Sequence, residues 1–187
     1  MLLARLKAGE DRAFDDLVRE YQERIIGFAH RLVGDFDDAC DVAQETFIKA
    51  HQAIGNFRGD AVLYTWLYRI AHNQAISLLR RRKILSFLRL DIGAEEPSLV
   101  APERTDAGVE CREVTILIQR AIADLPPRQR SIFVMRNFEG MSHGEIAAIV
   151  GSSDGAVRAG YFHAVRKLRK ALHATGQFDE RALKSES

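Results

Sequence analysis

Aromatic and polar side chains are mixed in the segment FRGDAVLYTWLYRIAHN, which runs from Phe57 to Asn73. It holds one Phe, two Tyr and the only Trp of the chain, interleaved with Arg58, Arg69 and His72. A core helix does not need so many polar groups, and a surface helix does not need so many aromatic rings. The mixture offers flat faces for stacking and charged or amide groups for hydrogen bonding, which is the chemistry of binding.

A second candidate site depends on the spacing of Ala147, Gly151 and Val157. A small residue lets two helices cross closely, a glycine four positions later can take the positive φ of a turn, and an apolar residue six positions further packs back. This spacing is typical of a helix-turn-helix, whose second helix enters the major groove. Ser142 and Glu145 form an S-x-x-E capping box just before it. The alternative is an αα-hairpin with a solvated basic face.

The predicted second helix of this motif carries the side chains that could reach bases or phosphates. They are Arg158, His163, Arg166, Lys167, Arg169 and Lys170.

A third candidate site is acidic. Asp37, Asp41 and Glu45 are spaced four apart, with Asp38 and Gln44 beside them. Like charges at this spacing destabilise a helix by roughly 0.2–0.5 kcal/mol per pair. The helix dipole explains the first of them, but Asp41 and Glu45 lie too far along the helix. A face that binds Arg and Lys of a partner would explain them. Taken alone, the cluster is better explained as a solvated face.

The composition is that of a globular protein, with 187 residues, 47% hydrophobic and 28% charged. The net charge is only +1, but residues 35–45 hold five acids and no base, whereas residues 66–83 and 158–170 each hold five bases and no acid. Segregated charge indicates basic and polyanionic partners at different places. Cys40 and Cys111 lack CxxC spacing, which fits a reducing compartment. Since the first residues lack a signal-peptide pattern and no apolar run approaches about 18 residues, we expect a soluble, cytoplasmic protein.

Apolar residues at three- and four-residue steps predict helices at 2–8, 11–33 and 36–54, and from 60 or 61 to about 83. Residues 86–110 contain Gly, Pro and acids without a period. Further helices are predicted at 114–123, from the LPP at 125–127 to about 138, after Ser142, and from 152 or 153 to about 174. The predicted fold is all-α: a helical bundle at 1–85, a flexible linker at 86–112, a helix-turn-helix domain at 113–176 and a tail at 177–187.

Three segments resemble the extracytoplasmic-function (ECF) sigma factors of bacterial RNA polymerase. DDACDVAQETFIKAHQAI is similar to their polymerase-binding helix, and FRGDAVLYTWLYRIAHNQAISLLRRRK to the segment that binds and opens the −10 element. LPPRQRSIFVMRNFEGMSHGEIAAIVGSSDGAVR is similar to their −35-binding domain. The segments follow the family's order, and the resemblance covers the chain from about Leu2 to Ala171.

The resemblance implies a promoter-specificity subunit with two DNA sites and one polymerase site. The polymerase site would consist of Asp37, Asp38, Asp41, Gln44 and Glu45, docking on the largest polymerase subunit. The −10 site would consist of Phe57, Arg58, Tyr64, Arg69, Asn73, Arg80, Arg81 and Arg82. The −35 site would consist of Ser153, Asp154, Ala156, Arg158, Ala159, His163 and Arg166. The partners implied are core RNA polymerase, promoter DNA and an anti-sigma factor, often membrane-anchored.

Promoter opening explains the composition of the Phe57–Asn73 segment. Unstacking costs a few kcal/mol per step. Stacking on an aromatic side chain offsets roughly 1–3 kcal/mol of this for each base. Phe57 is expected to be mainly functional and Trp66 mainly part of the core. The run Arg80–Lys83 is expected to hold phosphates, or else to be a solvated helix end that complements the dipole.

The −35 helix departs from the family. Members carry a T-V-K-S-R-like string where this chain reads Ala156-Val157-Arg158-Ala159-Gly160, and Val165 replaces another basic residue. A glycine inside a helix costs about 1 kcal/mol relative to alanine. These departures fall on the helix that would read the −35 element, so they bear on its sequence preference and on its strength.

Two other classes of function explain the sequence less well. A helix-turn-helix regulator that binds duplex DNA alone leaves the acidic helix and the aromatic segment unexplained. An enzyme would need a catalytic pattern, but the six histidines are scattered and H-E-x-x-H, P-loop and G-x-S-x-G patterns do not occur. His30 and Cys40 could be posed as a metal pair, but a core or surface histidine is the simpler interpretation. We therefore expect no catalytic residues, no metal and no cofactor.

Overall fold

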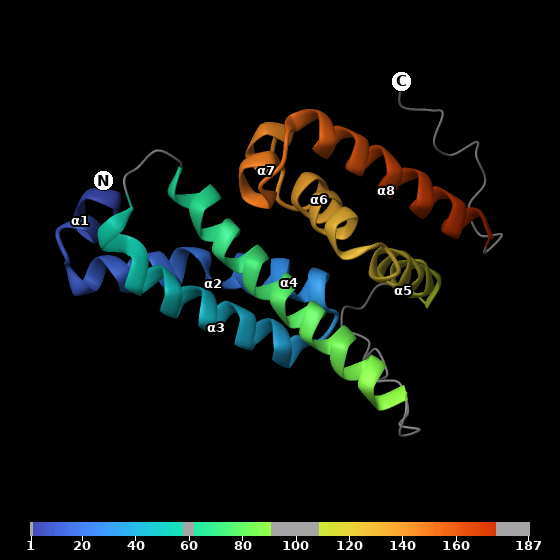
Figure 1. Cartoon of the computed structure of the whole chain (residues 1–187), viewed down its shortest axis with the longest axis horizontal. Coiled ribbons are helices and arrows are strands. Elements are labelled where there is room, and N and C mark those ends of the chain that lie inside the picture. The colour runs from blue at the N-terminus through green and yellow to red at the C-terminus, as the bar shows by residue number, and fades with distance from the viewer. Residues whose placement is uncertain (1, 58–61, 91–108, 175–187) are drawn as a thin grey trace.

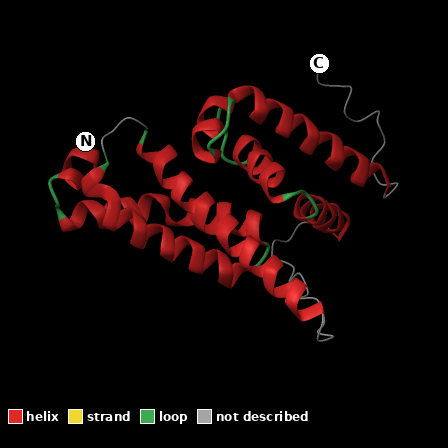
Figure 2. Ribbon diagram, in the orientation of Figure 1, coloured by secondary structure: helices red, strands yellow, loops and turns green. Residues whose placement is uncertain are grey.

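The computed structural model describes residues 2–57, 62–90 and 109–174, and within them every regular element is helical (Figures 1 and 2). The elements are α1 (Leu2–Lys7), α2 (Asp11–Val33), α3 (Phe36–Ala53), the 3-10 helix η1 (Ile54–Asn56), α4 (Leu63–Leu90), α5 (Val109–Ala123), α6 (Pro127–Asn137), α7 (His143–Val150) and α8 (Asp154–Ala174). The predicted all-α fold is confirmed, with the N-terminal helices on one side and α5 to α8 on the other (Figure 1).

The first bundle is formed by α1 to α4, and its helix ends follow the sequence signals. Gly34 ends α2 with φ 83° and donates its backbone N–H to the carbonyl of His30 at 2.8 Å. Asp35 then caps α3, since its carboxylate accepts the N–H of Asp38 at 2.9 Å. The apolar stripe of α3 is buried as its spacing predicts, and consists of Ala39, Val42, Ala43, Thr46, Phe47 and Ala50.

Two helices extend into the segment predicted as linker. α4 continues to Leu90 rather than to about Lys83, because no Gly or Pro interrupts the chain before Gly93. α5 begins at Val109, before the predicted helix start at 114. The rest of the predicted linker, 91–108, and the predicted tail, 177–187, lie outside the described residues.

The second bundle contains the predicted helix-turn-helix. Ser142 and Glu145 cap α7 reciprocally. The N–H of Ser142 donates to Oε2 of Glu145 at 2.8 Å, and the N–H of Glu145 donates to Oγ of Ser142 at 3.2 Å. Gly151 makes the turn with φ 63°. Ala147 and Val157 are buried where α7 and α8 meet. The spacing of Ala147, Gly151 and Val157 therefore has the structural role that the sequence predicts for it.

The two bundles pack against each other. α4 contacts α7, α2 contacts α5 and α6, and one cluster of buried apolar side chains continues through both bundles. Arg130 of α6 crosses to the first bundle and donates to the carbonyl of Leu32 at 2.5 Å, and it also donates to the carbonyls of Ala123 and Leu125. Burial lowers the pKa of this guanidinium. The sequence does not predict this close packing of the two bundles.

None of the helices among the described residues combines the length and the apolar character that a membrane span requires.

Candidate nucleic-acid and partner interfaces

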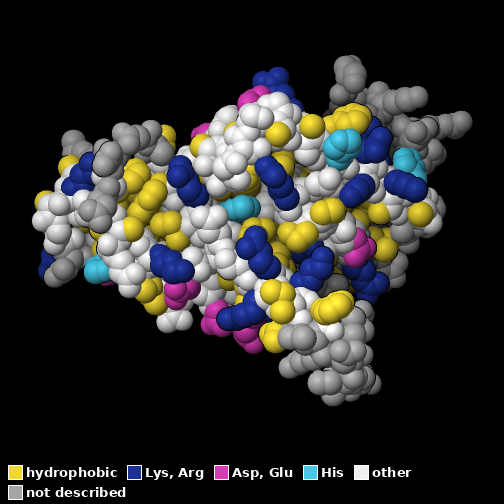
Figure 3. All heavy atoms as spheres, in the orientation of Figure 1, with side chains coloured by type: hydrophobic (Ala, Val, Ile, Leu, Met, Phe, Trp, Pro, Cys, Tyr) yellow, Lys and Arg dark blue, Asp and Glu magenta, His cyan; other side chains and the backbone are white. Residues whose placement is uncertain are grey.

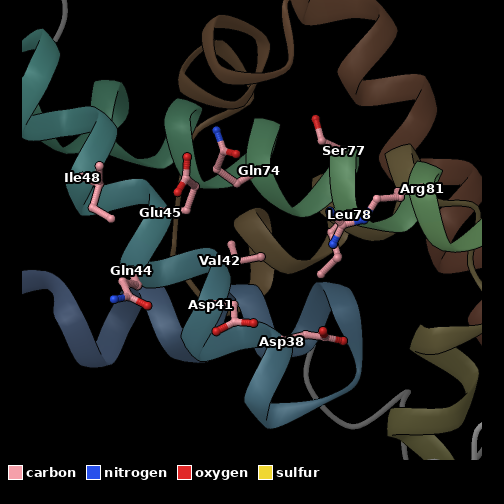
Figure 4. A pocket seen from close by; sticks show the side chains of 10 residues that line it. All are labelled: Asp38, Asp41, Val42, Gln44, Glu45, Ile48, Gln74, Ser77, Leu78 and Arg81. Atoms are coloured by element: carbon pink, nitrogen blue, oxygen red, sulfur yellow. The ribbon is translucent and has the colours of Figure 1, made fainter.

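An acidic groove of about 570 Å³ lies between α3 and α4 (Figure 4). Its α3 wall carries Asp38, Asp41, Gln44 and Glu45, four of the five residues predicted for the polymerase site. The α4 wall is formed by Gln74, Ser77, Leu78 and Arg81. Asp37, Asp41, Gln44 and Glu45 are exposed. The structure thus gathers four of the five predicted residues along one wall, and Asp37 is exposed elsewhere on the same helix.

Asp38 and Arg82 were predicted for different sites, but they form an ion pair with each other. Arg82 also donates to the carbonyl of Val33 at 3.2 Å, at the C-terminal end of α2. A cation at that end complements the helix dipole. In this conformation Arg82 therefore joins α4 to the ends of α2 and α3.

Arg69, Asn73 and Arg80 share one exposed face of α4. They are spaced four and seven residues apart, so they stack along one side of the helix. A guanidinium, an amide and a second guanidinium in this order can donate to base edges and to phosphates. Arg81, which is also exposed, points toward the acidic groove instead.

Tyr64 lies on a different side of α4. It precedes Arg69 by five residues, about 140° around the helix. Its ring packs between Tyr21 and Tyr68 at centroid distances of 6.4 and 4.5 Å, and Arg24 lies 5.0 Å above it. Tyr64 is therefore half-buried between the bundles rather than aligned with Arg69 and Asn73.

Trp66 was expected to be the core residue and Phe57 the functional one, but Phe57 is the more buried of the two. Phe57 is only 8% exposed, within a core cluster that includes Leu6 and Leu17, whereas Trp66 is only partly buried. Their ring centroids lie 5.0 Å apart. Phe57 immediately follows η1, whose turn directs its ring against α1 and α2, so in this conformation it offers no free stacking face. Arg58 lies outside the described residues.

The −35 set lies at the start of α8 and along its outer side. Ser153 caps the helix, because its hydroxyl accepts the N–H of Ala156 at 3.2 Å. Arg158 bonds to Asp154 at 2.5 Å and its side chain is still 68% exposed. Ala156, Ala159, His163 and Arg166 are exposed as well. The structure thus keeps all of the predicted set together on one accessible helix.

Gly160 does not belong to that exposed side. It lies three residues after buried Val157 and four before buried Ala164, on the side of α8 that faces α6. A Cβ at position 160 would lie 2.8 Å from Cδ1 of Ile132. The glycine is therefore explained by the close approach of α8 to α6, which spacing within one helix could not reveal.

Phe162 is a candidate contact that sequence reasoning missed. It is 62% exposed and lies four residues from both Arg158 and Arg166 on the outer side of α8. An apolar side chain at such a position can contact the methyl group of thymine. The sequence held one signal for it: Phe162 is a large apolar residue that lies outside the apolar stripe of Val157, Ala164 and Leu168.

Charge is divided across the surface as well as along the sequence. On the face shown in Figure 3, many Lys and Arg side chains lie over α4 and the second bundle, and several Asp and Glu side chains gather along the lower edge, where α3 runs. In the described part of the chain, no three His, Cys, Asp or Glu residues are grouped so as to hold a metal ion. Cys40 is a free thiol.

Both bundles match known families. Residues 17–84 match the family described as Sigma-70 region 2, and residues 115–168 match Sigma-70, region 4. The first match contains the acidic groove and the exposed face of α4, and the second contains the helix-turn-helix.

Individual proteins are similar over nearly the whole chain. The RNA polymerase sigma-H factor of Pseudomonas aeruginosa is 39% identical over 180 residues, covering 91% of this chain and 92% of that protein. The ECF RNA polymerase sigma-E factor of Salmonella typhimurium is 36% identical over 173 residues, covering 88% of each.

Two solved structures share the fold. CnrH, in complex with the cytosolic domain of CnrY, superposes with a TM-score of 0.70 at 26% identity, covering 92% of this chain and 96% of that one. The sigma factor RpoE of Bartonella quintana, in complex with the anti-sigma factor NepR, gives a TM-score of 0.69 at 22% identity, covering 86% of this chain and 96% of that one. These arrangements of helices agree with the one described above.

Proposed function

Because the chain belongs to the ECF sigma factors of the sigma-70 family, we propose that it binds bacterial core RNA polymerase, recognises −10 and −35 promoter elements and starts transcription. Phosphodiester chemistry belongs to the polymerase, and the chain contributes no catalysis of its own. The observation that carries this proposal is the presence, on one chain, of an exposed acidic wall on α3 and two separate exposed faces with basic residues, on α4 and α8.

The polymerase site is the acidic groove together with Asp37, which is exposed on the same helix, α3. Asp41 and Glu45 repel each other along α3, and basic side chains of a partner would relieve that repulsion. Gln44 and Ile48 add an amide and an exposed apolar side chain to the same wall. The groove therefore suits a partner helix that carries Arg or Lys beside an apolar residue.

The −10 site is the outer face of α4, together with Phe57 and Arg58, which precede that helix in the sequence. Arg69 and Asn73 hydrogen-bond base edges or backbone there, and Arg80 neutralises phosphates. Arg81, predicted for the same role, lines the acidic groove in this conformation and joins the site by turning away from it. Phe57 anchors the end of η1 in the core, and Arg58, which lies outside the described residues, is proposed for the same site from the family resemblance. Tyr64 and Arg82 join this site once their contacts within the chain are released.

The −35 site is the outer side of α8. Arg158, His163 and Arg166 contact bases and phosphates, with Phe162 as an apolar contact between them. Ser153, Asp154, Ala156 and Ala159 shape the start of the helix, where small side chains allow close approach to the groove.

Regulation by an anti-sigma factor completes the proposal. The similar RpoE of Bartonella quintana is described in complex with an anti-sigma factor, and CnrH in complex with a cytosolic domain. By analogy with these two complexes, this chain would be a cytoplasmic sigma factor that is bound and inhibited by an anti-sigma factor. That anti-sigma factor would itself be anchored in the membrane.

Binding titrations against two probes test the proposal. The labelled chain is titrated with bacterial core polymerase, and separately with a pool of genomic duplex DNA in the absence of polymerase. We expect tight binding to core and weak binding to duplex DNA. Tight duplex binding without any affinity for core would instead indicate an independent helix-turn-helix regulator.

A further inference from the structure

The boundary between the bundles contains a buried carboxylate. Glu139, in the loop between α6 and α7, has a side chain that is only 6% exposed. Its Oε2 accepts a hydrogen bond from the hydroxyl of Tyr68 on α4 and lies 3.6 Å from Nη2 of Arg24 on α2. One acidic side chain of the second bundle is thus held by two donors of the first.

Tyr64 adds a third donor to this site. Its hydroxyl donates to the backbone carbonyl of Glu139 at 3.3 Å. Burial, followed by the negative charge of Glu139, raises the pKa of Tyr64 to about 12. Burial and the hydrogen bond to Glu139 raise the pKa of Tyr68 as well. Both hydroxyls therefore stay protonated at neutral pH. Tyr68 and Arg24 donate to the carboxylate, and the Tyr64 hydroxyl lies beside them as a further donor.

Further contacts along this boundary hold the two bundles together. Arg31 of α2 lies 4.5 Å from the ring centroid of Phe138, the residue before Glu139. At the other end of the boundary, Arg130 bonds to the carbonyl of Leu32. A carboxylate that is buried and bound at one point is costly to leave unpaired, so Glu139 favours the packed arrangement strongly.

We propose that Glu139 is an internal competitor of promoter DNA: its carboxylate occupies an anion site, formed by Arg24 and Tyr68 with the Tyr64 hydroxyl beside them, that takes a DNA phosphate when the bundles separate. This inference rests on the proposed function, since Tyr64 belongs to the −10 helix. In the packed arrangement the site is filled and Tyr64 is withheld. Separation exchanges the Glu139 carboxylate for a phosphate, and no covalent bond is made or broken.

The exchange should change how strongly the DNA-binding constant depends on salt concentration. Binding of single-stranded DNA weakens as salt rises, with a slope of log K against log salt of about −0.7 for each phosphate that is neutralised. In the wild-type chain, a phosphate that enters the site displaces an existing ion pair, so the net release of counterions is smaller. Without the Glu139 charge the slope becomes steeper, by up to about 0.7 for one phosphate.

The experiment uses a fluorescein-labelled dT20 oligonucleotide and the full-length chain. Glu139→Gln is compared with Glu23→Gln, which removes the same charge from an exposed position on α2. We expect Glu139→Gln to bind at least about threefold more tightly than Glu23→Gln and with the steeper slope, because a larger fraction of molecules is open. Equal affinity and equal slope for the two variants would overturn the proposal.

Two further variants make the result specific. Glu139→Asp keeps the charge but shortens the side chain, so it should also bind more tightly than wild type, and circular dichroism checks that it is folded. The double variant Arg24→Gln with Glu139→Gln should lose the gain. A gain that persists without Arg24 would show that the phosphate binds elsewhere, which contradicts the assigned site.

Core polymerase binding separates this inference from the function on which it rests. These substitutions leave the acidic groove untouched, so all variants should bind core polymerase as the wild type does. A wild-type chain that does not bind core would overturn the proposed function. Normal core binding with no effect of Glu139→Gln on dT20 would overturn the inference alone.

Discussion

Gly160 lies against Ile132, so close that a Cβ at position 160 would be 2.8 Å from Cδ1 of that side chain. Gly155, in the same helix, has no such neighbour within 4 Å. The two glycines of α8 therefore differ in what they do. Gly155 leaves open space, and Gly160 permits the contact between α8 and α6.

This difference predicts opposite effects of the same substitution. Gly155→Ala should raise the free energy of unfolding, by up to about 1 kcal/mol, because alanine favours helix. Gly160→Ala should lower it, because overpacking typically costs about 1–3 kcal/mol. Urea denaturation measures both. Ile132→Val removes the atom in conflict, so in that background Gly160→Ala should become stabilising; a penalty that persists there would contradict the contact.

Charge reversal on α3 should weaken polymerase binding. We expect Asp41→Lys with Glu45→Lys to reduce the affinity for core polymerase about tenfold or more, because basic groups of the partner would meet like charges. The loss of the exposed Glu45–Lys49 ion pair, 3.4 Å long, should hardly affect stability. Asp15→Lys with Glu23→Lys makes the same change of charge on exposed positions of α2 and serves as the control. Equal affinity of the two double variants would reject the acidic groove as the polymerase site.

Asn73 and Phe57 should differ in what their loss affects. Asn73 is exposed on α4. Asn73→Ala should therefore change the free energy of unfolding by only about 0.5 kcal/mol or less. The same variant should reduce permanganate reactivity of the −10 region.

Phe57 is buried. Phe57→Ala should therefore lower the free energy of unfolding by about 3–5 kcal/mol. A stable Phe57→Ala protein that fails only in promoter opening would restore the stacking role expected from the sequence.

His72 should make stability depend on pH. It is only 8% exposed, and burial, together with the positive charge of Arg128, lowers its pKa. In the unfolded chain a histidine takes up a proton near a pH of about 6.5, whereas folded His72 stays neutral at lower pH. The unfolded state then binds more protons, so stability is retained above about pH 6.5 and falls below it, by at most about 1.4 kcal/mol per pH unit.

The variant His72→Gln removes this contribution. Its free energy of unfolding should fall less steeply than that of the wild type between about pH 7 and about pH 5. His173→Gln, which changes an exposed histidine at the end of α8, should keep the wild-type slope. Parallel curves for wild type and His72→Gln would show that His72 titrates alike in the folded and unfolded states.

Local signals in the sequence predict most of the helices. Gly34, the S-x-x-E pair at Ser142 and Glu145, and the pair Pro126–Pro127 mark helix ends through their own backbone chemistry, so neighbours elsewhere in the fold hardly alter them. The sequence places the end of α4 too early, because the residues after Lys83 lose the apolar period of the preceding turns. A helix can continue without that period where no breaker interrupts it, and none occurs there before Gly93.

Properties that depend on contacts between distant segments could not be predicted. Whether Phe57 or Trp66 is the more buried depends on how the turn after α3 meets α1 and α2. The burial and the contact partners of Tyr64, Arg82 and Glu139 depend on how distant segments pack against one another. The exposure of residues on a single helix face, such as those of α8, could be predicted because the periodicity of that helix alone decides it.

Transcription from promoters is the activity that defines a sigma factor, and it can be measured directly. Bacterial core polymerase and the full-length chain are mixed with a genomic promoter library, and the 5′ ends of the run-off transcripts are sequenced. We expect chain-dependent starts that lie downstream of a shared −10 and −35 pair and that disappear with Asp41→Lys and Glu45→Lys. A chain that binds core polymerase but produces no starts of its own at any promoter of the library would contradict this expectation.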